Sequence, residues 1–430
     1  MGAPVNPHPA DPHPASPRPD ALRTVEQQQA IVLAAVRERG VVEAETVAID
    51  DAYGRTLAEP VRAAAAIPVF DNSAMDGFAV RFADVADASA ADPVTLRVVA
   101  DLPAGSPADP AIGPGEAVRI MTGSAVPSDA DVIVPFESTL GGLDDSLGEI
   151  TVHTAPSALG EHIRRRAVDA APGDEVVPRG IRLGAFQVSA AAGAGVARVT
   201  VSRRPRVAIV STGDELAEPG ADLERGQIPE SNGRLLAGLV AAAGGEVVLR
   251  TVVDDAGPGL RAALERAHDA DVVVFSGGVS AGAYEVVKNE LDDAMEFAKV
   301  AMQPGKPQGF GVREGVLLFG LPGNPVSVAV SFEVFVRPAL LALQGARELT
   351  RPLVRLPAAA AWRTPPGRRQ YLPAVIDRRD PARWSVAPAT AGGSGSHLVG
   401  GLGRAEAFAI VPAEVEAVAP GDLVDVLLLP

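Results

Sequence analysis

Between about Leu183 and Gly345 the sequence alternates apolar runs with helix-forming runs, and this pattern limits the fold more than any other feature. The runs PRVAIVST, EVVLRTVV, DVVVFSGG and GVLLFGLPG are short and nearly continuous, which is typical of strands buried on both faces. Helix-forming stretches such as NGRLLAGLVAAAG and PGLRAALERAH separate them. Strands that alternate with helices of this length predict a mostly parallel sheet with crossover helices. We therefore expect an α/β domain over residues 183–345.

The segments on either side of this domain have the texture of β structure. Residues 53–145 are short apolar runs broken by Gly, Pro and Asp, which predicts a β-rich domain. Residues 350–430 hold further short runs, such as YLPAVID and AFAIVP, which predict a small β-barrel-like domain. A helix is expected to begin near Thr24, because Thr24 and Gln27 fit a capping box, and to end at Gly40. Residues 1–22 are rich in Pro and read as a disordered tail.

Composition excludes several classes of protein. A chain of 430 residues without any cysteine has no disulfides, zinc thiolates, iron–sulfur ligands or cysteine nucleophiles. The net charge of −16 argues against nucleic acid as the main partner, since phosphate binding requires clustered Lys and Arg. We find no signal peptide and no run of about 20 continuous apolar residues, so we expect a cytoplasmic protein without a membrane span.

Polar motifs follow three of the predicted strands. In open parallel sheets, ligands bind in the crevice at the carboxyl ends of the strands, so these motifs are candidates for one binding site. They are STGDEL, SGGVSAG and LPGNPVS. The candidate ligand-binding residues in them are Thr212, Gly213, Asp214, Ser276, Gly277, Gly278, Ser280, Pro322, Gly323 and Asn324.

The SGGVSAG turn has two interpretations. Gly277 and Gly278 would let the backbone approach a ligand, while Ser276 and Ser280 would add hydroxyl donors beside a helix N-terminus that favours an oxyanion. Alternatively, the glycines serve only the geometry of a tight turn between strand and helix, because a glycine-rich turn is weakly specific.

Four carboxylates lie in or near these turns: Asp214, Glu215, Glu230 and Glu285. Acidic residues are usually surface groups or helix caps, and Glu230 fits a cap. Carboxylates gathered beside a phosphate site are nevertheless what Mg²⁺ requires, because it binds a few carboxylates together with phosphate oxygens and water.

Two lysines follow, Lys299 and, within PGKP, Lys306. Both could neutralise an oxyanion, although a lone lysine is more often a solvated surface residue. In the β-rich region, IPVFDNSAMDGFAVR contains a polar cluster around Asp71 and Asp76, and RIMTGSAVP contains a Thr122-Gly123 turn. Ordinary turns are the structural alternative for both segments.

Taken together, FDNSAMDGFAVR, RIMTGSAVP, GEHIRRR, STGDEL, SGGVSAG, PGKP and LPGNPVS resemble the molybdopterin molybdotransferase family, the bacterial relatives of the gephyrin E domain. They occur in the family's order and cover nearly the whole chain beyond the tail. The resemblance implies a β-rich domain, a molybdopterin-binding α/β domain, a C-terminal barrel, and an elongated, discontinuous linker domain formed by residues 23–52 and 146–182. It also implies a homodimer, with an active cleft shared between chains, and contacts with other molybdenum-cofactor enzymes.

The implied activity joins molybdate to adenylyl-molybdopterin, with Mg²⁺, to give molybdenum cofactor and AMP. By similarity, Asp71 and Thr122 would be catalytic residues from the partner chain. Glu215, Glu230 and Glu285 would hold metal, with Glu215 and Lys299 also catalytic and Lys306 on the substrate side. Glu230 and Glu285 stand where Asp is frequent in the family, and Gln303 stands where Lys is common, which removes one positive charge from the molybdate side.

Two other functions remain open from the sequence. One is the adenylyltransferase that makes the adenylylated intermediate, since it shares the α/β domain, although no P-loop of the form GxxxxGK[ST] is present. The other is a scaffold that binds partner tails, as gephyrin-like E domains do.

Overall fold

The computed structural model describes residues 22–143, 146–278, 286–390 and 398–429. By its contacts the chain divides into two compact units. The first combines the chain up to Glu45 with Ser202–Pro430, and the second is Thr46–Val201. The chain passes from one unit to the other within β1 (Ala44–Ala48) and β12 (Arg198–Ser202).

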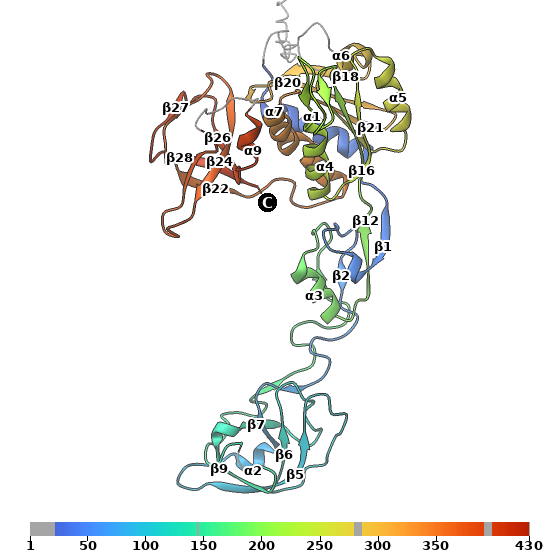
Figure 1. Cartoon of the computed structure of the whole chain (residues 1–430). Coiled ribbons are helices and arrows are strands. Elements are labelled where there is room, and N and C mark those ends of the chain that lie inside the picture. Colours follow the sequence, from blue (N-terminus) through green and yellow to red (C-terminus); the bar gives the residue numbers. More distant parts are fainter. Residues whose placement is uncertain (1–21, 144–145, 279–285, 391–397, 430) are drawn as a thin grey trace, which may run out of the picture. The chain divides into compact units, whose positions relative to one another are not determined.

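The central sheet of the first unit has the strand order β16-β13-β17-β21-β20-β18. Its strands β16, β18, β20 and β21 are labelled in Figure 1. The bounds are β13 Arg206–Thr212, β16 Glu246–Val253, β17 Val272–Ser276, β18 Met295–Lys299, β20 Pro307–Arg313 and β21 Val316–Leu321. β16, β13, β17 and β21 are parallel, which confirms the prediction of a mostly parallel sheet. β20 and β18 continue the sheet as an antiparallel pair that the sequence analysis did not predict.

Helices cover both faces of this sheet. One face packs against α1 (Val25–Arg39), α4 (Asn232–Ala242) and a long helix made of α7 (Pro325–Ser331), the π-helical segment η3 (Phe332–Val336) and α8 (Arg337–Leu343). The other face packs against α5 (Pro258–Arg266) and α6 (Val286–Glu290). Successive residues of β13 alternate between the layers, because Ile209 lies in the first core and Val210 in the second.

The predicted first helix is present as α1. Thr24 and Gln27 form its capping box, and Gly40 caps its end with φ +86°. The resemblance placed this helix in a linker domain, but Val25, Val32 and Val36 instead pack in the α/β core. Residues 183–201, expected to open the α/β domain, form α3 (Ala185–Gly193) and most of β12 within the second unit.

The helix from Pro325 to Leu343 is long and apolar enough to cross a membrane by length and composition. In the structure, 89% of its most apolar window is buried inside the protein. Phe332, Val336 and Leu340 are fully covered, so its apolar character is accounted for by core packing.

The C-terminal strands form a second sheet in this unit, with the order β19-β24-β26-β28-β22 and β25 beside β24. The bounds are β19 Met302–Gln303, β22 Leu353–Pro357, β24 Arg369–Asp377, β25 Ser385–Pro388, β26 Ala407–Val411 and β28 Leu423–Leu428. A bridge between Ala358, which follows β22, and Val386 of β25 links the last strand of this order to the strand beside β24, so the sheet is partly barrel-like, as expected. Smaller elements are β23 (Trp362–Arg363), β27 (Ala417–Val418) and α9 (Val399–Leu402).

The second unit is built around a sheet with the order β7-β4-β6-β5-β9-β8. The bounds are β4 Gly77–Val80, β5 Val94–Leu102, β6 Glu116–Ile120, β7 Val132–Pro135, β8 Thr139–Leu140 and β9 Glu149–Val152. Two short ladders are also present. β3 (Asn72–Ser73) with β10 (Ile163–Arg164) packs against this sheet, whereas β2 (Val61–Arg62) with β11 (Glu175–Val177) packs in a separate core with α3 and β12. The segment also contains α2 (Phe82–Val85) and the 3₁₀ turns Ile49–Asp51 and Phe136–Ser138.

Candidate active site

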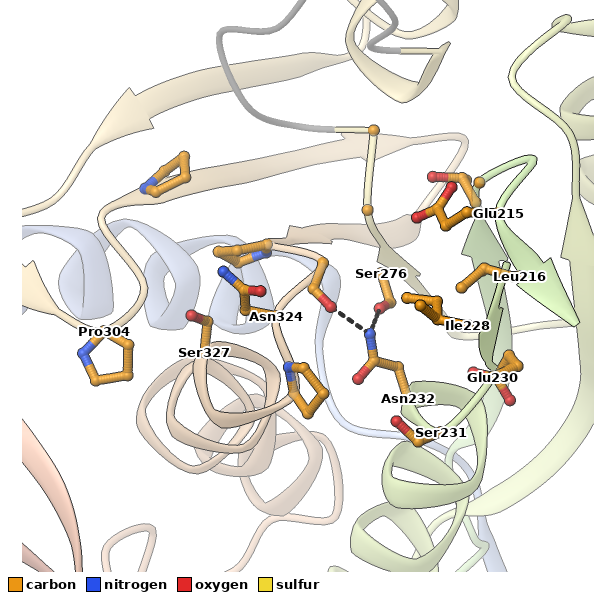
Figure 2. Close-up of a pocket in the computed structure, with 18 of the residues that line it drawn as sticks. Glu215, Leu216, Ile228, Glu230, Ser231, Asn232, Ser276, Pro304, Asn324 and Ser327 are labelled. Carbon is orange, nitrogen blue, oxygen red and sulfur yellow. Dashed lines mark hydrogen bonds between the residues drawn. The ribbon is translucent and has the colours of Figure 1, made fainter. Parts of the chain in front are cut away.

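A cavity of about 560 Å³ lies at the carboxyl ends of the four parallel strands. Its lining includes residues that follow β13, β16, β17 and β21, and it also includes the start of α4 and the loop between β19 and β20. Parallel strands direct their carboxyl ends to one edge of a sheet, which is why motifs far apart in sequence meet here (Figure 2).

Eleven of the residues predicted from sequence line this cavity. They are Thr212, Gly213, Glu215, Glu230, Ser276, Gly277, Gly278, Lys306, Pro322, Gly323 and Asn324. Ser280 and Glu285 lie outside the described residues. Asp71 and Thr122 belong to the second unit.

Two predicted residues do not line the cavity. The Asp214 carboxylate turns to the neighbouring loop, where it accepts the backbone N–H of Asp255 at 3.3 Å. Lys299 ends β18, and β18 is separated from the parallel strands by β20. The catalytic role that the resemblance implies for Lys299 stays a prediction, and the sequence analysis did not recognise the antiparallel strands that carry this residue.

The turn after β17 requires its glycines for backbone reasons. Gly277 and Gly278 have φ values of +95° and +67°, in the left-handed region that favours glycine. A Cβ at Gly277 would lie 2.7 Å from the Thr212 carbonyl oxygen and 2.8 Å from its hydroxyl oxygen. The glycines are thus explained by turn geometry, and close approach to a ligand is an additional use of the same backbone.

Asn232, the first residue of α4, ties two of the strand ends together. Its side-chain amide donates to the Ser276 hydroxyl at 2.8 Å and to the Gly323 carbonyl at 2.6 Å, as Figure 2 shows. The sequence analysis included Asn232 only as the first residue of the helix-forming run NGRLLAGLVAAAG. In the structure it fixes the turns after β17 and β21 relative to α4.

The carboxylates of the cavity have different environments. Glu215 is exposed, and its carboxylate receives no hydrogen bond from a described residue; it folds back over Gly213, where an added Cβ would lie 2.5 Å from Oε2. Glu230 is only 3% exposed and accepts hydrogen bonds from Gly233 N–H at 2.6 Å and Arg234 at 2.9 Å.

Glu230 therefore has a structural use that differs from the metal ligand implied by the resemblance. With Ser211 as a third donor at 3.1 Å, its carboxylate caps the start of α4 and holds an ion pair. Asp255, which the sequence analysis missed, does line the cavity. It follows β16, so the argument from strand ends that selected Glu215 would have found it as well.

The cationic side of the cavity is Lys306, which is half-buried and makes no side-chain hydrogen bond or ion pair with the described part of the chain. Gln303 also lines the cavity, and its side-chain oxygen accepts a hydrogen bond from Arg368 at 2.7 Å. A guanidinium therefore lies beside Gln303, where the resemblance implied the loss of a positive charge.

Asp71 and Thr122 occupy a polar surface of the second unit. Asp71 accepts the Arg166 backbone N–H and the Arg165 guanidinium, both at 2.7 Å, and these bonds lower the pKa of its carboxyl. Thr122 donates its hydroxyl to Asp76 at 2.7 Å and its N–H at 2.6 Å. The three-arginine motif thus orients Asp71, a connection that the sequence did not reveal.

Across the residues that the structure describes, no group of three or more His, Asp or Glu side chains forms a metal-binding cluster. Besides Glu230, which caps α4, the cavity lining contains the carboxylates of Glu215 and Asp255. That donor set fits Mg²⁺, which is commonly bound by one or two carboxylates and completes its coordination with water and substrate phosphate.

Three family models match the chain. Residues 23–195 match the MoeA N-terminal region (domain I and II), residues 208–342 a probable molybdopterin binding domain, and residues 355–429 the MoeA C-terminal region (domain IV). Molybdopterin molybdenumtransferase 2 of Mycobacterium tuberculosis H37Rv is 41% identical over 409 residues, covering 93% of this chain and 98% of the relative. Molybdopterin molybdenumtransferase of Nostoc is 39% identical over 310 residues, which is 70% of each chain.

Solved structures agree with these matches. Two crystal structures of a molybdopterin biosynthesis MoeA protein from Pyrococcus horikoshii superpose with TM-scores of 0.76 and 0.80. They are 32% and 27% identical to this chain, cover 95% of it, and are themselves covered over 99% and 100% of their length.

Proposed function

Because this chain belongs to the molybdopterin molybdenumtransferase family, we propose that it inserts molybdate into adenylyl-molybdopterin and yields molybdenum cofactor and AMP. Relatives of that name match nearly the full length of the chain, and this favours the transferase over the adenylyltransferase or scaffold alternatives. The observation that carries the proposal is the cavity at the strand ends, where exposed Glu215 and unpaired Lys306 contribute to the same lining within the described residues.

The two substrates are both anions, and the cavity has groups suited to each. We propose that the backbone and hydroxyl groups of Ser276, Gly277 and Gly278 contact the pyrophosphate of adenylyl-molybdopterin. Lys306 would offset the charge of molybdate, in place of Lys299, which does not line the cavity. Binding both anions in one cavity orients them for reaction and contributes through proximity.

We propose that Mg²⁺ binds on the side of Glu215 and Asp255, with Glu285 as a further ligand that lies outside the described residues. When bound, the ion would supply charge stabilisation at the phosphate oxygens. Glu215 is suited to this role because its carboxylate is exposed and uncommitted among the described residues. Glu230 is not part of this proposal, because its carboxylate already caps α4 and pairs with Arg234.

We further propose that the protein acts as a homodimer in which Asp71 and Thr122 of one chain complete the cavity of the other. The support is local to the second unit: Asp71 is held by Arg165 and Arg166 beside the exposed apolar residues Val69 and Phe70. Exposed apolar side chains that lie together are candidates for part of an interaction surface.

Release of AMP from adenylyl-molybdopterin tests the function. We expect purified protein to release AMP only when molybdate and Mg²⁺ are both present, and Lys306→Ala to raise the molybdate concentration required. Consumption of ATP with free molybdopterin, without molybdate-dependent AMP release, would instead establish the adenylyltransferase activity.

A further inference from the structure

The segment Gln303–Pro307, hereafter the Lys306 loop, packs against the long helix formed by α7, η3 and α8. Gly305 has φ +98°, and a Cβ there would lie 2.9 Å from the Ser331 hydroxyl oxygen and 3.1 Å from the end of Met302. All five residues of the loop line the cavity. The position of Lys306 therefore depends on how firmly this backbone is held.

A buried polar pair holds it. Gln308 is 3% exposed, and its side-chain amide donates to the Gly305 carbonyl and to the Ser331 hydroxyl, both at 2.7 Å. Ser331 is fully buried at the end of α7. Both amide hydrogens of Gln308 are thus used, and they connect the loop to the helix whose first turn also lines the cavity.

The helix changes character directly after Ser331. Residues Phe332–Val336 are π-helical, and such segments occur often at functional sites. Arg368 holds the other end of the loop through Gln303. The Lys306 side chain itself makes no hydrogen bond or ion pair with any described residue, so only its backbone is fixed.

We infer that Gln308 and Ser331 are positioning residues for oxyanion binding: they hold the Lys306 loop so that the lysine meets molybdate without reordering. This inference rests on the proposed function. A buried hydrogen-bonded pair lowers the conformational cost of binding because the loop is already ordered before the ligand arrives. Loss of the pair should therefore weaken the binding of molybdate and leave the binding of adenylyl-molybdopterin unchanged.

The test compares Gln308→Leu with Gln344→Leu. Gln344 is a matched control, since it is also 3% exposed and donates its side-chain amide to two carbonyls, those of Ala243 and Leu340, but it does not line the cavity. Both variants should lower the thermal midpoint. Only Gln308→Leu should raise the KM for molybdate, by about tenfold, with kcat and the KM for adenylyl-molybdopterin nearly unchanged.

Ser331→Ala should also raise the KM for molybdate. The double variant should have the same KM for molybdate as Gln308→Leu, because the two residues act as one unit. Equal KM values for molybdate in Gln308→Leu and Gln344→Leu would overturn the inference. If the wild type releases no AMP with molybdate, the proposed function itself is wrong. If the wild type is active but Lys306→Ala binds molybdate normally, the function stands and the positioning role is excluded.

Discussion

At the scale of single residues, Glu215 and Glu230 show how two carboxylates of one cavity take different roles. We expect Glu215→Ala to abolish AMP release while changing the unfolding midpoint little, because the side chain is exposed and has no hydrogen-bond partner among the described residues. Glu230→Ala should instead cost about 2 kcal/mol of stability, since it removes the cap of α4 and leaves Arg234 and Gly233 short of a partner.

Urea unfolding and AMP release, measured on both variants, separate the two roles. If Glu230→Ala has normal stability but its AMP release no longer depends on Mg²⁺, Glu230 is a metal ligand and not a helix cap.

A substitution at Gly277 can separate two costs of an added Cβ: the strain of a positive φ and the close contact with Thr212. Gly277→Ala should lose more stability than Gly105→Ala. The two glycines have similar φ values, +95° and +86°, but a Cβ at Gly105 meets nothing within 4 Å. The strain of a positive φ costs roughly 1 kcal/mol in both, and the contact with Thr212 adds to it only at Gly277. Similar thermal midpoints for the two variants would show that the turn after β17 shifts to accept the added Cβ without a further loss of stability.

Which residues gather at the cavity could largely be predicted, because parallel strands fix the edge at which their loops meet. The role of each residue in the cavity could not be predicted. From the sequence, Glu230 fitted both a helix cap and a metal ligand, and only its burial and its ion pair with Arg234 favour the cap. Asp255 was missed although it follows a predicted strand, so there the sequence held enough information.

At the scale of elements, Asp271 joins three segments of the α/β unit. It is 4% exposed, and it accepts two bonds from Arg203, at 2.6 and 2.8 Å, one from the Arg206 N–H at 2.7 Å, and one from Arg39 of α1. Burial raises the pKa of Asp271, but the hydrogen bonds from Arg203 and Arg206 and the charges nearby outweigh it, so the pKa lies below its usual value.

A lowered pKa in the folded state gives stability that is present above the unfolded pKa of about 3.9 and is lost as pH falls toward the folded value. We expect Asp271→Asn to lower the thermal midpoint at pH 7 and to flatten its decline below about pH 4. Asp269→Asn is the control, because Asp269 is exposed and its two ionisable neighbours, Arg206 at 3.1 Å and His268 at 3.5 Å, have exposed side chains as well. Equal pH profiles for wild type and Asp271→Asn would contradict this account.

The elements that the sequence predicted well have strong local signals, whereas β18 and β20 have weak ones. The capping box of α1 and the apolar runs of β13, β17 and β21 are in the predicted places. β20 contains Gly309 and Gly311, which usually indicate turns. Here they admit close neighbours, since a Cβ at Gly311 would lie 1.9 Å from the Ala294 carbonyl oxygen. The close approach of Ala294 to Gly311 is visible only in the folded sheet, so the sequence could not show why glycine is required in this strand.

At the scale of the whole molecule, the proposed catalytic residues are divided between two compact units. Glu215 and Lys306 belong to the first unit, and Asp71 and Thr122 to the second. Each group is ordered by contacts within its own unit, as in the bonds from Arg165 to Asp71 and from Gln308 to Gly305. The bonds that order each group lie within one unit, so the proposed shared cleft depends on how two chains assemble.

Co-expression of two inactive variants tests that assembly. If each site combines the first unit of one chain with the second unit of its partner, Glu215→Ala mixed with Asp71→Ala forms heterodimers with one intact site, and about a quarter of all sites recover. The control mixes Glu215→Ala with Lys306→Ala; both changes lie in the first unit, so no site regains both wild-type side chains and AMP release does not exceed that of Lys306→Ala alone. Recovery in the first mixture alone would establish a shared site. If each site is shared between chains, every heterodimer contains one site built from a wild-type first unit and a wild-type second unit. Heterodimers that form without recovering AMP release would therefore place Asp71 outside the partner's cleft.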